Sequence, residues 1–333
     1  MTVKVSVIIP VYNVEQYLAQ CLESVLSQTL REIEVVAIND GSPDGSLQIL
    51  QTYAARDARL RIIDKKNEGV GKARNDGLRA ATGEFIAFLD SDDYYPNETV
   101  LETLVQAAEI HNVSIAGGRK IRLLADGQIE RDAGDAEAYG MTFSASGLMR
   151  YGDYQYDYGY TQYLYDRRML IENGIFFPAY KRFQDPPFFV RAMQAAGSFY
   201  AADCESYCYR MVPGAQKYSI DSTLDFLKGL TDNLNFSRQN GLAKLHRLCA
   251  LRLDREGSFM AIRNLYGEDR LQLLAAYLDA FRVVDPAWLA ENGQALPAPF
   301  VPEVFQYAVS TAEKYEKLRA NGALRALRRI IRK

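Results

Sequence analysis

The first third of the chain alternates between two patterns of hydrophobic and polar residues. Short runs rich in β-branched residues alternate with segments in which apolar residues recur every three or four positions. The runs are residues 3–9, 33–38, 60–63, 84–89 and 113–116, and the periodic segments are residues 14–28, 46–56, 71–81 and 98–111. The first pattern is typical of buried parallel strands and the second of amphipathic helices. Their alternation predicts right-handed βαβ units, and therefore an α/β fold with a mostly parallel sheet flanked by helices.

The pattern changes after residue 120. Residues 126–140 are rich in Gly, Ala and Asp and predict a loop, residues 151–165 are dense in tyrosine, and residues 175–177 resemble a short strand. Helical stripes of apolar residues follow, at Leu224, Leu227, Leu230 and Leu234 and then at Leu271, Leu274, Leu278 and Phe281.

These changes predict a boundary near residue 218. We expect an α/β domain over residues 1–218, with halves 1–120 and 121–218, and a helical C-terminal region over residues 219–333.

The composition narrows the class of protein. The 333 residues are 48% hydrophobic and 24% charged, which is ordinary for a globular protein, and the formal net charge of −3 gives no reason to expect nucleic acid. No apolar run reaches the ~18–20 residues that cross a bilayer. The N-terminus enters a strand pattern directly, without the charged and apolar regions of a signal peptide. We therefore expect a cytoplasmic protein.

Cysteine and histidine are too scarce and scattered for most metal or nucleophile sites. The four cysteines form no C-x-x-C pair, and His111 and His246 are the two histidines. A Cys/His zinc site and a Ser-His-Asp triad are therefore not expected. Acid–base chemistry in this chain must come from carboxylates.

Four polar loops follow the predicted strands. They are residues 10–13 (Pro-Val-Tyr-Asn), 39–46 (Asn-Asp-Gly-Ser-Pro-Asp-Gly-Ser), 67–77 (Asn-Glu-Gly-Val-Gly-Lys-Ala-Arg-Asn-Asp-Gly) and 90–93 (Asp-Ser-Asp-Asp). In open parallel sheets ligands bind beyond the carboxyl ends of the strands, so we expect these loops to meet. They do not match a Walker A loop, which would need Gly and Ser or Thr where Lys66 and Ala73 stand, or a dinucleotide fingerprint, which would need Gly in place of Arg74.

The loop 90–93 holds three carboxylates with no basic residue adjacent in sequence. Such a cluster usually needs a divalent cation or another compensating charge. Mg²⁺ and Mn²⁺ prefer oxygen ligands and typically take one or two protein carboxylates together with phosphate oxygens. The alternative is a solvated turn in which an Asp caps the helix that follows.

Two further side chains allow both a functional and a structural interpretation. Asp40 ends a predicted strand, where it could accept an N–H from a nucleotide base or form an Asx-turn before Gly41. Arg74 lies near the start of a predicted helix, where its guanidinium could bind diphosphate oxygens or simply be solvated.

In this order the four loops resemble those of the family 2 glycosyltransferases with the GT-A fold, the large class that includes bacterial polysaccharide and lipopolysaccharide enzymes. The similarity covers residues 1–215 and includes the D-x-D-D run at 90–93. It implies a Rossmann-related GT-A domain whose half 1–120 binds a nucleotide-sugar, usually a UDP-sugar, and whose half 121–218 binds the acceptor. It also implies Mn²⁺ or Mg²⁺ as cofactor.

The resemblance assigns roles to individual residues. Asp40 would contact the base, Asp90 and Asp92 the ribose and the metal–diphosphate, and Arg74 the diphosphate, with Asp92 or Asp93 as the metal ligand. The donor-binding residues implied are Pro10, Tyr12, Asn13, Asp40, Asn67, Gly69, Arg74, Asp90, Ser91 and Asp92.

The catalytic base in this family often belongs to a Glu-Asp pair before a helix. The matching segment, residues 182–189, has Gln184 in place of Glu but retains Asp185. The resemblance implies that Asp185 takes the proton of the acceptor hydroxyl. Since Gln184 carries no charge, its side chain is not expected to raise the pKa of Asp185. The alternative is that Asp185 is the N-cap of a helix that Pro186 begins.

Further candidates concern the acceptor and the membrane. Arg210, in a segment that resembles a strand end of the family, would meet the diphosphate or the acceptor. The alternating Tyr154, Tyr156, Tyr158 and Tyr160 would share one face of a strand, which could be a platform for sugar rings, with Tyr156 and Tyr158 as acceptor contacts, or a half-buried core face. Residues 324–333 have apolar and arginine-rich helical faces, which fit either an anionic membrane surface or a solvated helix.

Together these features predict a metal-dependent inverting glycosyltransferase of cell-surface polysaccharide synthesis, acting on a glycan or lipid-linked acceptor, cytoplasmic and peripheral on the inner face of the membrane. Two alternatives stay open. A sugar nucleotidyltransferase would usually carry a Gly-rich basic loop after the first strand, which residues 10–13 lack. A non-catalytic relative that binds nucleotide-sugar or glycan is compatible with Gln184.

Overall fold

A computed structural model describes residues 2–131, 143, 145–211, 219–264, 269–297 and 300. Contacts divide the chain into two compact units, Met1–Lys217 and Tyr218–Lys333. The predicted boundary at residue 218 differs from this division by one residue.

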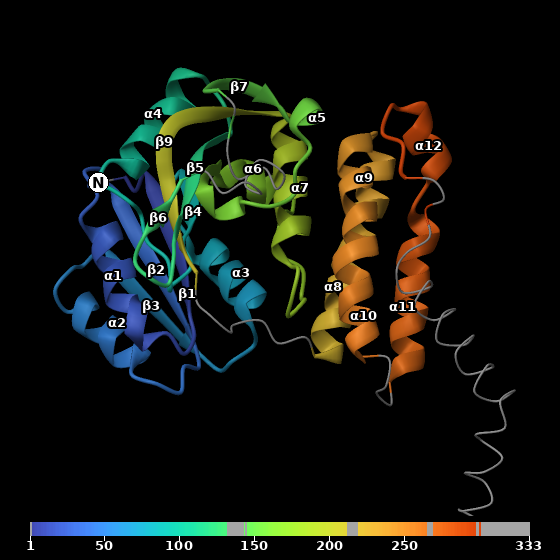
Figure 1. Cartoon of the computed structure of the whole chain (residues 1–333). Coiled ribbons are helices and arrows are strands. Elements are labelled where there is room, and N and C mark those ends of the chain that lie inside the picture. The colour runs from blue at the N-terminus through green and yellow to red at the C-terminus, as the bar shows by residue number, and fades with distance from the viewer. Residues whose placement is uncertain are drawn as a thin grey trace, which may run out of the picture. The chain divides into compact units, whose positions relative to one another are not determined.

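One mixed sheet forms the centre of the first unit (Figure 1). Its strands are β1 (Val5–Val11), β2 (Ile33–Asp40), β3 (Leu60–Lys65), β4 (Phe85–Phe88), β5 (Ile115–Leu123), β6 (Ile129–Glu130), β7 (Gly147–Arg150), β8 (Tyr163–Asp166) and β9 (Ser198–Arg210). They follow the order β3-β2-β1-β4-β8-β5-β9-β7, with β6 paired to β5. The strands β1 to β4 are parallel, whereas β8 lies antiparallel between β4 and β5.

Helices cover both faces of this sheet, which confirms the predicted α/β class (Figure 1). Helices α1 (Glu15–Leu26), α2 (Ser46–Ala54) and α4 (Val100–Ile110) bury their apolar residues against one face. Helix α3 (Val70–Ala80) packs on the other face of β1 and β2, where a Cβ at Gly77 would collide with Ile8 and Ile38. The short helices α5 (Tyr151–Tyr154), η1 (Tyr160–Gln162) and α6 (Arg167–Glu172), and the longer α7 (Asp185–Ala196), complete the unit.

The second unit is helical within its described residues. It comprises α8 (Ile220–Gln239), α9 (Ala243–Arg252), the π-helical turn η2 (Leu253–Gly257), α10 (Ser258–Asn264), α11 (Arg270–Val283) and α12 (Pro286–Glu291). The stripe predicted on α8 is buried, as Leu227, Leu230 and Leu234 are at most 1% exposed. None of the described helices combines the length and the hydrophobicity that a membrane span requires.

The stripe predicted on α11 is wrong. Leu271 is 74% exposed, and the buried residues are Leu273, Tyr277 and Ala280. The Tyr277 hydroxyl donates to the Leu253 carbonyl at 2.9 Å, which fixes this face inward. Two apolar stripes of similar spacing lie on the same helix, so periodicity alone does not decide which one is buried.

Candidate active site

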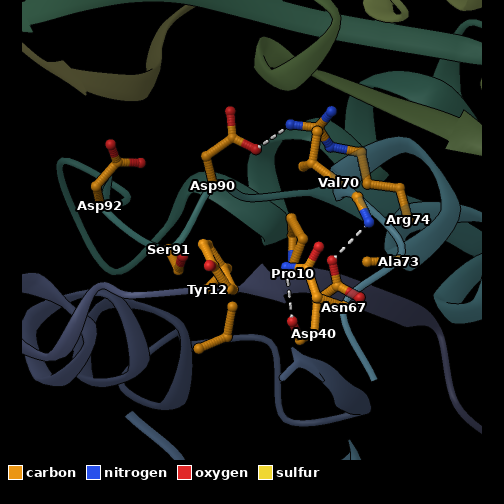
Figure 2. Close-up of a pocket in the computed structure, with 12 residues that line it drawn as sticks. Pro10, Tyr12, Asp40, Asn67, Val70, Ala73, Arg74, Asp90, Ser91 and Asp92 are labelled. Carbon is orange, nitrogen blue, oxygen red and sulfur yellow. Dashed lines mark hydrogen bonds and ion pairs between the residues drawn. The ribbon is translucent and has the colours of Figure 1, made fainter. Parts of the chain in front are cut away.

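A cavity of about 450 Å³ lies at the carboxyl ends of β1, β2 and β4 and at the start of α3 (Figure 2). It is lined by Pro10, Val11, Tyr12, Asp40, Asn67, Gly69, Val70, Ala73, Arg74, Asp90, Ser91 and Asp92. Nine of the ten residues assigned to the donor are in this set, and Asn13 is outside it. Asn13 has a left-handed backbone (φ 53°) and donates its N–H to the Ser42 hydroxyl, which joins the first two loops.

Asp40 holds the loop that begins α3. Its two carboxylate oxygens accept the N–H groups of Glu68 and Gly69, each at 2.9 Å, and Asn67 Nδ2 donates to its carbonyl at 3.0 Å. The carboxylate is 2% exposed and also borders the cavity. The alternative of an isolated Asx-turn at Asp40 is therefore wrong, because its partners lie in another loop.

Arg74 is buried rather than solvated, with 5% of its surface exposed. Its Nη2 donates to Asp90 Oδ1 at 2.6 Å, as the dashed line in Figure 2 marks, and its guanidinium lies 5.0 Å from the centre of the Tyr160 ring. Burial lowers the pKa of Arg74, but the charges of Asp90 and Tyr160 outweigh it and the pKa is raised. Its Nε and Nη1 atoms are buried without a hydrogen-bond partner. Buried donors of this kind are costly, so an acceptor oxygen of a ligand or of water would stabilise them.

The three carboxylates of the loop 90–93 have different surroundings. Asp90 and Asp92 line the cavity, and burial together with the charge of Asp90 raises the pKa of Asp92. Asp93 is 1% exposed and outside the cavity, where it accepts from Tyr207 Oη at 2.6 Å and from the Arg210 N–H at 2.7 Å. Burial and its two acidic neighbours raise the pKa of Asp93.

The structure therefore argues against two of the predicted roles for this loop. Asp93 is held by protein donors instead of facing the cavity, so it does not fit a metal ligand there. None of the three Asp residues caps α4, whose N-cap is Thr99. Among the described residues, no group of three or more His, Cys, Asp or Glu side chains could hold a metal ion by itself.

Three further residues belong to this site: Tyr207 and Lys120, to which the sequence assigned no role, and Tyr160, which it indicated as part of the tyrosine face and not as a partner of Asp90. The Tyr160 hydroxyl lies 3.1 and 3.3 Å from the two oxygens of Asp90, and Tyr207 bonds Asp93 and accepts the Asp90 N–H at 3.2 Å. The Lys120 ammonium lies 4.9 Å from the centre of the Tyr207 ring. Burial lowers the pKa of Lys120, although Asp93, Asp90 and Asp185 oppose this shift. The tyrosine density near Tyr160 was the one available signal.

Asp185 is the first residue of α7, and Gln184 is the N-cap, without a side-chain cap bond. The alternative of Asp185 as N-cap is therefore wrong. Burial raises the pKa of Asp185 even without an ionised neighbour at 184, Arg74 and Lys120 oppose this shift, and Asp90 adds to it. These charges connect Asp185 electrostatically to the cavity residues. Gln184 is buried, and its Oε1 has no hydrogen-bond partner.

The acceptor candidates are outside the cavity. The predicted tyrosine strand is wrong, since α5 ends at Tyr154, Gln155 is left-handed (φ 54°) and η1 begins at Tyr160. Tyr156 packs on Tyr154 with ring centres 4.9 Å apart, and Tyr158 packs on Phe183 at 6.1 Å. Between these two helices the backbone turns at Gln155, so the tyrosines do not share one face of a strand.

Arg210 supports the acidic loop. Its Nε donates to the Asp92 carbonyl at 2.9 Å, its Nη2 donates to Gln20 Oε1 at 2.5 Å, and its guanidinium lies over the Tyr17 ring. The basic tail, residues 324–333, is outside the described residues.

Comparisons with known proteins bear on this site. A model of the family described as glycosyl transferase family 2 matches residues 6–172. EpsJ of Bacillus subtilis (strain 168), described as an uncharacterized glycosyltransferase, is 45% identical over 113 residues, which are 34% of this chain and 33% of EpsJ. Chondroitin synthase of Escherichia coli is 44% identical over 96 residues, which are 29% of this chain and 14% of that protein. The matched stretches thus span a third or less of these relatives.

A likeness among solved structures extends over most of the chain. The crystal structure of S. aureus TarS 1-349 in complex with UDP-GlcNAc matches with a TM-score of 0.68 and 24% identity, covering 88% of this chain and 84% of that one. This likeness confirms the predicted GT-A type of α/β fold.

Proposed function

The chain belongs to glycosyl transferase family 2, and from this premise we propose that it is an inverting glycosyltransferase that uses a nucleotide-sugar. The observation that carries the proposal is Arg74, whose two buried N–H-bearing nitrogens have no partner and whose side chain lines the cavity. A guanidinium fork of this kind suits the oxygens of a diphosphate. The UDP-GlcNAc in the related TarS structure supports a UDP-sugar as the donor.

Within the cavity, the nucleoside and the diphosphate would bind different residues. Pro10, Tyr12, Asp40 and Asn67 come from the first three loops and would bind the nucleoside. Ser91 and Asp90 would lie beside the ribose. Arg74 would bind the diphosphate. Asp40 is well suited to a fixed contact, because two backbone N–H groups already hold its carboxylate.

Mn²⁺ or Mg²⁺ fits this site through Asp92. Its carboxylate lines the cavity, and its pKa is raised by burial and by Asp90, so a nearby cation would favour the ionised form. These metals typically use one or two protein carboxylates and complete their coordination with phosphate oxygens and water. The metal would supply charge that stabilises the departing diphosphate.

Asp185 would act as the general base. The acceptor hydroxyl oxygen forms a bond to the anomeric carbon of the donor while the bond from that carbon to the diphosphate oxygen breaks. The proton of the hydroxyl passes to the Asp185 carboxylate, and the electron pair leaves with the nucleoside diphosphate. A raised pKa makes Asp185 a stronger base than an ordinary aspartate once it is ionised.

The acceptor would be a glycan or a lipid-linked sugar of cell-surface polysaccharide synthesis. Tyr156 and Tyr158 are partly exposed and are candidates for acceptor contacts. The basic tail 324–333 would hold the enzyme at the anionic inner face of the cell membrane.

The function is tested by measuring nucleotide release from a panel of nucleotide-sugars, with and without Mn²⁺. We expect release from one UDP-sugar, lost in EDTA and restored by Mn²⁺ or Mg²⁺. Asp92→Asn should lower the metal-stimulated rate by at least about 10-fold, because it removes a charged ligand. Asp93→Asn should instead keep the metal dependence, because this carboxylate bonds Tyr207 and Arg210 and does not line the cavity.

Two results would contradict this assignment. Equal UDP affinity in EDTA and in Mn²⁺, measured by calorimetry, would exclude the metal role. UDP binding without release from any donor and acceptor pair would favour a non-catalytic binding protein.

Deletion of residues 324–333 should reduce sedimentation with anionic liposomes and leave activity on a soluble acceptor analogue near normal. The contact would be polybasic, so salt should weaken the binding of the intact chain. Liposomes of neutral lipid provide the control. Binding that survives the deletion, or that salt does not change, would refute the membrane role.

A further inference from the structure

Tyr160 is held firmly next to two residues that line the cavity, Asp90 and Arg74. It is 5% exposed, and its ring packs against Phe88, Phe177 and Phe188 with ring centres 5.9, 5.5 and 6.4 Å apart. Its carbonyl accepts the Tyr165 hydroxyl at 2.7 Å. With both ring and backbone held, the Tyr160 hydroxyl has little freedom to follow a moving partner.

That hydroxyl meets the carboxylate of Asp90, at 3.1 Å from Oδ1 and 3.3 Å from Oδ2. Asp90 Oδ1 also accepts from Arg74 Nη2 at 2.6 Å, and the Arg74 guanidinium stacks 5.0 Å over the Tyr160 ring. The three side chains therefore form one network, in which Tyr160 contacts both members of the ion pair.

The form of that ion pair, between the buried Arg74 and the only partly buried Asp90, is unusual. A carboxylate and a guanidinium commonly make two parallel hydrogen bonds. Here Asp90 accepts a hydrogen bond from a single nitrogen of Arg74, Nη2. The Nε and Nη1 atoms have no hydrogen-bond partner although both are buried. If the Asp90 side chain rotated, its carboxylate could also accept a hydrogen bond from Nε or Nη1. The hydrogen bond from the Tyr160 hydroxyl to the carboxylate opposes this rotation.

We infer that Tyr160 is a positioning residue for the donor: it holds Asp90 in single contact with Arg74, so that Nε and Nη1 remain available for diphosphate oxygens. The inference rests on the proposed function, since it needs a diphosphate ligand. Without the hydroxyl, Asp90 can close on Arg74 with two bonds, and the donor must first break one of them. Preorganisation of this kind lowers the cost of binding.

The test is the affinity for UDP of Tyr160→Phe, measured by calorimetry at a fixed Mn²⁺ concentration. The substitution keeps the ring packing and removes one hydroxyl. We expect about 10-fold weaker binding, equivalent to ~1.4 kcal/mol. The KM for the donor should rise similarly while kcat at saturating donor stays near wild type. Tyr154→Phe is the matched control, because it removes a buried hydroxyl that bonds Tyr163 and not Asp90.

A double-mutant cycle separates positioning from packing. In an Asp90→Asn background the competing carboxylate charge is gone, so Tyr160→Phe should cost less than about 3-fold in UDP affinity. An unchanged affinity of Tyr160→Phe, an equal loss in Tyr154→Phe, or the same loss in both backgrounds would each overturn the inference. Wild-type protein that binds no UDP would instead refute the proposed function.

A further test of the inference uses the wild-type protein, so it does not depend on whether a variant folds. The ¹⁵N resonance of the Arg74 Nε–H group should move when UDP saturates the protein, since this group gains an acceptor. An unmoved resonance at saturation would overturn the inference while leaving donor binding itself established.

Discussion

Asp185→Asn should lower the rate of sugar transfer by about 10²–10⁴-fold, the range expected for loss of a positioned general base. UDP affinity should change little, because Asp185 is outside the set of residues that line the cavity. The side-chain volume is conserved, and no cap bond is lost at α7. Because burial raises the pKa of Asp185, its ionised form opposes folding at neutral pH, so the neutral Asn should leave the melting temperature equal or higher.

The pH profile gives a second check on the same residue. A base is lost when it is protonated, and the pKa of Asp185 is raised above the ordinary 3.8. The acid limb of kcat/KM should therefore lie at higher pH than for a solvated aspartate, and Asp185→Asn should abolish it. Asp153→Asn is the control, because Asp153 is exposed and pairs with Arg150 on the surface. A variant at Asp185 that keeps more than about a tenth of wild-type turnover, with chemistry rate-limiting, would refute the assignment.

The arrangement of the cavity was predictable because of a rule of parallel sheets. The strands β2, β1 and β4 are adjacent and parallel, so the loops that follow them begin at the same edge of the sheet. Pro10, Asp40 and Asp90 therefore come together from distant parts of the sequence. The polar character of each loop was visible in the sequence, and the strands before them were continuous apolar runs. Local pattern and topology thus pointed to the same place.

The second half of the first unit did not follow from such a rule. The strand β8 inserts antiparallel between β4 and β5, and Tyr160, three residues before it, lies within hydrogen-bond distance of Asp90. The resulting hydrogen bond joins residues 70 positions apart in the sequence and leaves no periodic signal. Of the long strand β9, only the end at Arg210 was indicated by the sequence. The rest was not predicted, because Asp203 and Glu205 interrupt its apolar character. Both elements depend on tertiary contacts that propensity does not encode.

The different fates of the three adjacent carboxylates could not be predicted for the same reason. Asp90, Asp92 and Asp93 are equivalent in sequence, yet Asp93 turns to Tyr207 and Arg210 of β9 while Asp92 lines the cavity. The partners of Asp93 belong to a strand more than 100 residues away in the sequence. Which of the three Asp side chains face the cavity therefore depends on the tertiary structure. The positive charge expected near these carboxylates is supplied by Arg74, Arg210 and Lys120.

Arg74→Met should weaken UDP binding by about 100-fold or more, a loss of ~3 kcal/mol and within the range for truncating one partner of a buried charge pair. The substitution removes the two unpaired donor nitrogens and the hydrogen bond from Arg74 to Asp90. The Asp90 carboxylate then keeps its contact with the Tyr160 hydroxyl. Asp90 keeps 28% of its side chain exposed, so water can solvate part of the uncompensated charge and the loss of stability should be smaller than the loss of affinity.

Arg74→Lys separates the charge of this residue from its geometry. Lysine restores a cation near Asp90 but has no planar fork, so it should recover the melting temperature more fully than the UDP affinity. Arg79→Met is the control on the same helix, since Arg79 is 57% exposed and lies beyond the cavity. If Arg74→Lys bound UDP as tightly as wild type, a simple positive charge would suffice, and the two unpaired nitrogens would have no role in recognising the diphosphate.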